Sequence, residues 1–204
     1  MGFVFKMNFN KPLLIVVSAP SGAGKSTLCN KLLAESERLV YSISCTTRKP
    51  RGQEQDGVAY HFLTEEEFVA RIENGDFLEN AIVHGNRYGT LRSTVEQALK
   101  QGKSIIMDID VAGAAQVRDI INALPEDNLI RDSFIDIFIT VPSIEELEAR
   151  LNKRGEDAPD VIQKRLNNAK GEIARANEYQ HIVVNDELER AYAELCKILA
   201  EASK

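Results

Sequence analysis

The chain has 204 residues and is acidic, with a formal net charge of -6 and an isoelectric point near 5.2. An acidic balance argues against nucleic acid as the main partner, and no apolar run is long enough to cross a membrane. The three cysteines and three histidines are scattered without metal-ligand spacing. We therefore expect one substantial α/β core in a cytoplasmic protein that has free thiols and no nucleic-acid or membrane partner.

The chain is expected to start with a short arm that leads into a buried strand. Residues 1–11 contain no long apolar segment and no cleavage site, which predicts a disordered arm and not a targeting signal. Residues 13–17 are an aliphatic run, which predicts a buried parallel strand. A helix is expected over residues 25–34, directly after a Gly-rich turn.

The sequence SAPSGAGKST over residues 18–27 predicts a phosphate-binding loop. Gly22 and Gly24 let successive backbone N–H groups point into one concavity, Lys25 supplies a cation for the outer phosphates, and the Ser26 hydroxyl can bind Mg²⁺. Ala19 stands where this pattern usually has its first glycine, which is acceptable if its φ is negative. A plain turn between strand and helix is the alternative, but the flanking strand and helix favour a nucleoside triphosphate site. The residues expected to contact ATP are Ala19, Pro20, Ser21, Gly22, Ala23, Gly24, Lys25, Ser26 and Thr27.

The rest of the chain alternates between strands and helices except for one block. Residues 45–90 are rich in Gly, Arg and polar side chains and are predicted to form an inserted subdomain, with strands at 58–63 and 77–83 and a helix at 65–72 capped by Thr64 and Glu67. Core strands are expected at residues 40–44, 104–109, 134–141 and 181–184. Core helices are expected at about residues 93–102, from the end of the strand at 109 to about 121, and at 143–153, 160–177 and 188–200. Ser93 and Ser143 are the predicted N-caps of two of these helices, and residues 123–133 are expected to be a loop. The alternation predicts an α/β fold with a parallel sheet, helices on both of its faces, and ligands at the carboxyl ends of the strands.

Two further features carry chemistry beside the phosphate-binding loop. Arg48 and Arg51 lie three apart in a Pro-containing turn and can form a bidentate phosphate clamp, although such a run taken alone is more often a solvated loop. Asp108 ends an apolar strand, where an aspartate can hold the Mg²⁺ shell of a P-loop enzyme. The alternative for Asp108 is a helix cap.

Eight spaced motifs resemble the guanylate kinase family. In chain order they are SAPSGAGKST, S-x-x-T-R-x-P-R, G-x-x-Y, F-L-E, Y-G-T, D-I-D, R-L-x-x-R-G and I-V-V-N-D, and the likeness covers residues 13–199. The resemblance implies a P-loop kinase that transfers the ATP γ-phosphoryl group to GMP, with ATP and GMP as substrates and Mg²⁺ bound with ATP. It also implies a domain over residues 12–204, divided into a core (12–44 and 91–204), a GMP-binding insertion (45–90) and a lid (about 150–165).

The resemblance assigns roles to individual residues. The GMP phosphate would be held by Arg48, Arg51, Tyr60 and Tyr88. Guanine would be read by Ser44, Glu79, Thr90 and Asp110, which suits its chemistry because carboxylates accept from N1–H and N2–H₂ while a hydroxyl can donate to O6. The catalytic cations would be Lys25 and the lid arginines Arg150, Arg154 and Arg165, and Asn185 would lie on the adenine side. For Arg150, an ion pair with Glu146 one helical turn away is the alternative.

Three departures from the family pattern and two other functional classes stay open. Ala112 replaces a common Gln, Arg87 replaces a common Tyr, and the segment over residues 123–133 is longer than usual. A non-catalytic guanylate-kinase-like module that binds a protein is one alternative, and a P-loop kinase with a phosphorylated sugar as acceptor is the other. The sequence leaves the oligomeric state open between monomer and homodimer.

Overall fold

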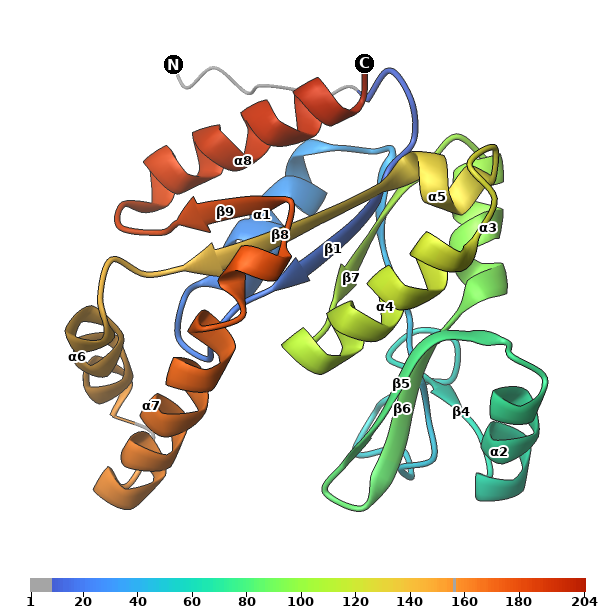
Figure 1. Ribbon diagram of the computed structural model, residues 1–204. Helices are drawn as coiled ribbons and strands as arrows, with labels where there is room; N and C mark the ends of the chain where they lie inside the picture. The colour runs from blue at the N-terminus through green and yellow to red at the C-terminus, as the bar shows by residue number, and fades with distance from the viewer. Residues whose placement is uncertain (1–8, 156) are drawn as a thin grey trace.

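A five-stranded parallel sheet forms the centre of the structure, a computed structural model that describes residues 9–155 and 157–204 and only the backbone of Arg154 (Figure 1). The strand order is β2 (Leu39–Tyr41), β7 (Ser104–Asp108), β1 (Leu14–Ser18), β8 (Phe134–Thr140) and β9 (His181–Val184). Val17 of β1 pairs with Asp108 of β7, so the two strands end side by side at the edge where α/β proteins bind ligands.

Helices cover both faces of this sheet, which confirms the predicted α/β class. Successive β1 residues point to opposite faces, so Ile15 and Val17 join one hydrophobic cluster while Leu14 and Val16 join another. The first cluster includes α1 (Lys25–Glu35), α6 (Ile144–Arg154), α7 (Pro159–Ile173) and α8 (Leu188–Ala202). The second includes α3 (Arg92–Lys100), α4 (Val111–Ala123) and α5 (Leu129–Ser133). Among the described residues, no helix combines the length and the apolar character needed to cross a membrane.

A second, four-stranded sheet lies beside the carboxyl edge of the first (Figure 1). Its order is β4 (His61–Phe62), β3 (Cys45–Thr46), β6 (Asn86–Leu91) and β5 (Phe77–Val83), and α2 (Glu65–Glu73) packs on it. Phe68 of α2 stacks on Phe77 with ring centroids 4.5 Å apart, which gives this sheet a small core of its own. The predicted capping box of α2 is confirmed, because Thr64 and Glu67 each accept a hydrogen bond from the other's backbone N–H.

One side chain joins the second sheet to the core by two hydrogen bonds. Gln116 of α4 accepts from the backbone N–H of Asn80 in β5 (3.1 Å) and donates to its carbonyl oxygen (3.0 Å). The amide therefore pairs with the strand as a neighbouring strand would, and it satisfies backbone groups at a sheet edge. We refer to this contact as the Gln116–Asn80 latch.

The structure corrects several predicted element boundaries. The strand expected at 40–44 ends at Tyr41, and the one expected at 58–63 shrinks to His61–Phe62 because Gly57, at φ 73°, places residues 55–59 in a turn. The helix expected over 160–177 ends at Ile173, and a 3₁₀ turn, η1 (Ala176–Glu178), follows it. Ser93 does not cap α3, because β6 runs straight into the helix at Arg92. Strand β6, missed in the sequence, follows a two-residue hairpin turn at His84 (φ 49°) and Gly85 (φ 78°).

Two segments expected to be irregular are packed instead. For residues 9–11 the predicted disorder is wrong: Phe9 is only 4% exposed in the first cluster, and the Lys11 backbone N–H donates to the Ser203 carbonyl (3.0 Å). The other arm residues, 1–8, lie outside the described residues. The loop expected at 123–133 contains α5, which the Asn128 side chain caps and whose Ile130 is 1% exposed.

Candidate active site

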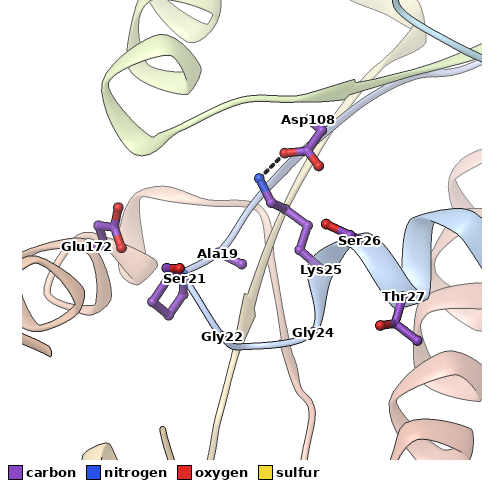
Figure 2. A pocket seen from close by; sticks show the side chains of 10 residues that line it. Ala19, Ser21, Gly22, Gly24, Lys25, Ser26, Thr27, Asp108 and Glu172 are labelled. Atoms are coloured by element: carbon purple, nitrogen blue, oxygen red, sulfur yellow. Dashed lines mark hydrogen bonds and ion pairs between the residues drawn. The ribbon is translucent and has the colours of Figure 1, made fainter. Parts of the chain in front are cut away.

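The loop between β1 and α1 has the backbone that phosphate binding requires. Gly22 and Gly24 adopt φ values of 99° and 90°, while His84 is the only described non-glycine residue with a positive φ. Ala19 therefore has a negative φ, the condition under which alanine can replace the usual first glycine of the loop. A cavity of about 340 Å³ opens above the loop (Figure 2). Its lining residues are Ala19, Pro20, Ser21, Gly22, Gly24, Lys25, Ser26, Thr27, Asp108 and Glu172.

Lys25 and Asp108 form an ion pair inside this cavity (Figure 2). Both side chains are about four-fifths buried, and Asp108 reaches the loop because β7 lies next to β1. In the nucleotide-free protein the ammonium of Lys25 is therefore neutralised by a carboxylate. The oxygens of Ser26, Asp108 and Glu172 share the same walls, and such hard oxygen donors suit Mg²⁺.

Glu172 is a cavity residue that the sequence interpretation missed. It lies on α7, across the loop from Lys25, and it is half-buried (Figure 2). Burial raises its pKa, the charge of Asp110 adds to the rise, and Lys25 opposes it. One signal was available: Glu172 follows the predicted site residue Arg165 by seven positions, which is two turns on one helix face.

The second sheet brings the proposed phosphate clamp together. The Arg48 guanidinium, 8% exposed, lies over the Tyr60 ring at 5.2 Å, and Tyr88 meets that ring edge-on at 5.9 Å. Glu54, also missed in the sequence, accepts two hydrogen bonds from Arg48 (2.9 Å each) and one from the Arg51 backbone N–H (2.8 Å). Its bond with Arg48 lowers the pKa of Glu54. Glu54 therefore fixes the turn that carries both arginines, and the Arg51 side chain stays exposed.

The residues proposed to read guanine meet where β5 and β6 approach the start of α4. Glu79 is 6% exposed and pairs across the sheet with Thr90, whose hydroxyl is also buried. Burial raises the pKa of the Glu79 carboxyl to about 7; contact with Thr90 opposes the rise, and the charge of exposed Asp110 adds to it. The half-buried Ser44 precedes Cys45, which pairs with Gly89 next to Thr90.

Gly113, in the first turn of α4, makes this arrangement compact. Its N–H donates to Asp110 (2.7 Å), so Asp110 caps the helix. A Cβ at position 113 would lie 3.3 Å from a Glu79 carboxylate oxygen and 3.5 Å from Asp110. The bare glycine therefore allows both carboxylates to approach the helix terminus.

Arg150 and Arg165, two of the predicted lid arginines, are paired with other groups and do not line the phosphate cavity. Arg150 instead lines an adjoining pocket with Gly22, Gly24 and Lys153. Arg150 donates to Glu146 (2.8 Å) and to the carbonyl of Asn185 (2.8 Å), so its expected alternative partner is present. Arg165 pairs with Asp157 at 2.6 Å. Arg154 ends α6, and its side chain lies outside the described residues.

Asn185 supports the phosphate-binding loop from below. It is 5% exposed, and its side-chain amide donates to the carbonyl of the fully buried Ala23 (2.7 Å). A Cβ on Gly24 would lie 2.3 Å from the same nitrogen, so no larger residue fits there. The amide is thus committed to the loop in this structure.

Comparisons with known proteins agree on one family. The family model "Guanylate kinase" matches residues 11–202. A guanylate kinase of Fusobacterium nucleatum subsp. nucleatum is 48% identical over 94% of this chain and 97% of its own, and one of Bacteroides thetaiotaomicron is 42% identical over 98% and 94%. The crystal structure of guanylate kinase from Anaplasma phagocytophilum matches with a TM-score of 0.67 and 33% identity, covering 97% of this chain and 90% of that one. The chain belongs to the guanylate kinase family.

Proposed function

We propose how this chain carries out the reaction of its family, the transfer of the γ-phosphoryl group of ATP to GMP to give ADP and GDP. The observation that carries the proposal is the pairing of two unlike sites at one sheet edge. One is the phosphate cavity around Lys25. The other is the second sheet, which carries the buried carboxylate of Glu79 and the cation–aromatic contact between Arg48 and Tyr60.

The donor ATP binds in the cavity above the loop. The backbone N–H groups of residues 21–26 and the N-terminus of α1 cradle the phosphates, and Lys25 leaves Asp108 to reach the outer ones. The Ser26 hydroxyl and the Asp108 carboxylate would hold the Mg²⁺ that accompanies ATP, which would supply positive charge to the phosphate oxygens. No group of three or more His, Cys, Asp or Glu side chains that could hold a metal ion occurs in the described residues. The Asn185 side chain positions the loop, so we assign the adenine contacts to the Asn185 backbone and to neighbouring residues.

The acceptor GMP binds over the second sheet. Arg48, Arg51, Tyr60 and Tyr88 hold its phosphate, and Glu54 keeps Arg48 in place until that phosphate arrives. Ionised Glu79 accepts from guanine N1–H and N2–H₂, with Asp110 beside it. The buried hydroxyl of Thr90 and the side chain of Ser44 complete the hydrogen-bond set.

Phosphoryl transfer then requires closure and no general base. The acceptor phosphate oxygen is already anionic, so catalysis depends on alignment and on cations that neutralise the transferring group. Arg150, Arg154 and Arg165 are the proposed lid cations, and Arg150 and Arg165 must leave Glu146 and Asp157 to act. Closure of the lid and of residues 45–90 over the core excludes water and suppresses hydrolysis of ATP.

An acceptor screen tests the proposal. ADP formation from ATP is measured in a coupled assay with one acceptor at a time: GMP, AMP, CMP, UMP or a phosphorylated sugar. Reactions that lack one of the coupling enzymes serve as controls. We expect turnover with GMP far above every other acceptor. Absence of ADP with any acceptor would leave only a binding role. We place the reaction in the cytoplasm, because Cys29, Cys45 and Cys196 are all free thiols.

A further inference from the structure

The phosphate cavity contains more negative than positive side-chain charge. Its lining includes one cation, Lys25, and two carboxylates, Asp108 and Glu172. Lys25 is already paired with Asp108, and none of the described side chains, which do not include that of Arg154, forms an ion pair with Glu172. A pocket that receives a polyphosphate therefore presents one uncompensated carboxylate to it.

Helix α7 holds Glu172 in that position. Ile162, Leu166 and Ala169 of α7 are buried in the first hydrophobic cluster, which fixes the rotation of the helix. Arg165 and Glu172, two turns apart, lie together on one flank of that buried face. The packing of α7 therefore holds the backbone of Glu172 beside the cavity.

A bare triphosphate and a metal-bound triphosphate interact with this carboxylate differently. Metal-free ATP carries about four negative charges near neutral pH, and in a partly buried site each is repelled by Glu172. A divalent cation between the phosphates cancels part of that charge. The waters it retains are hydrogen-bond donors, and a carboxylate is an acceptor for them.

We propose that Glu172 is a specificity-determining residue that makes the phosphate cavity select ATP complexed with a divalent cation over metal-free ATP. The inference rests on the proposed ATP site and adds a selection step to it. Lys25 and Asp108 attract and orient the complex, while Glu172 penalises the nucleotide that arrives without its metal.

The test is a binding measurement without turnover. ATP is titrated calorimetrically into the protein, with no GMP present, once in EDTA and once in excess MgCl₂. The readout is the dissociation constant in EDTA divided by the dissociation constant in MgCl₂. Glu172→Gln and Glu172→Ala should each lower this ratio roughly tenfold, mainly through tighter binding of metal-free ATP. Glu172→Asp keeps the charge and should keep a ratio close to that of the unmodified protein.

Glu148→Gln is the matched control, since Glu148 is exposed on the neighbouring α6 and does not line the cavity. Its ratio should not change. A ratio that stays constant in both charge-removing variants would overturn the inference, as would an equal fall in Glu148→Gln. These results leave the function intact if the unmodified protein still makes GDP. If it binds no ATP under either condition, the function and the inference both fail.

Discussion

Glu79→Gln should stabilise the folded, nucleotide-free protein and at the same time weaken its recognition of GMP. Burial raises the carboxyl pKa from 4.5 to about 7 in the nucleotide-free protein. Below pH 4.5 the group is protonated whether the chain is folded or not, so it carries no penalty. As the pH rises through 7, the folded protein must bury a charge that the unfolded chain exposes to water, and stability is lost.

The size of this loss follows from the shift. A rise from 4.5 to about 7 corresponds to about 3 kcal/mol at pH 8, an upper limit because the glutamine amide must also be buried. Glu79→Gln should therefore unfold roughly 4 to 10 °C higher than the unmodified protein at pH 8, and at nearly the same temperature at pH 4.5. Thermal unfolding followed by circular dichroism, without nucleotides, measures both differences. Glu148→Gln serves again as the control.

The same variant should be a poorer enzyme. An amide nitrogen in place of one acceptor oxygen faces the guanine N–H donors, so kcat/KM for GMP should fall by roughly two decades or more while KM for ATP changes little. In the unmodified protein, binding of GMP should strengthen as the pH rises from 6 to 8, because Glu79 must be ionised. If Glu79→Gln gains no stability at pH 8 relative to pH 4.5, the carboxylate is not destabilised by burial. If GMP kinetics are also unaffected, it does not read the base.

Four further outcomes are expected. Lys25→Met should lower kcat by roughly two to four decades in a folded protein, and near-normal turnover in steady-state assays would contradict the role of the loop. Asn185→Ala removes the hydrogen bond to Ala23 and should weaken calorimetric ATP binding roughly tenfold while GMP binding is kept; equal losses for both nucleotides would indicate general unfolding. Ile130→Ala should cost roughly 2–4 kcal/mol in urea denaturation, in contrast to a loop position, where less than 0.5 kcal/mol is expected. Small-angle scattering should show a smaller radius of gyration with a non-hydrolysable ATP analogue and GMP together than with neither, and an unchanged radius would argue for a preformed closed site.

The sequence was most informative where one residue type can serve only one geometry. The glycines of the phosphate-binding loop and the aliphatic run before them predicted strand, turn and helix, because positive φ and a two-sided burial leave strong local signals. The capping pair Thr64 and Glu67 was equally local and is confirmed.

What the sequence did not reveal depends on contacts between distant segments. Phe9 and Ile130 lie in polar surroundings along the chain and are buried only because the core offers them space. Glu54 and Glu172 look like ordinary surface carboxylates until the fold sets one against Arg48 and the other above the phosphate cavity. Asn185 was assigned to the adenine side, and only the fold shows its amide bound to the loop itself.

The Gln116–Asn80 latch has a consequence for protein engineering. The second sheet is built from one uninterrupted stretch of chain, which leaves the main sheet after β2 and returns at α3. Exchange of that stretch for the corresponding stretch of a relative needs only two junctions. The five-stranded sheet and its phosphate-binding loop stay intact. Because Gln116 bonds to the backbone of Asn80 and not to its side chain, it accepts any residue there except proline, which has no N–H. A chimera that keeps Gln116 should therefore dock a foreign acceptor module in the native orientation.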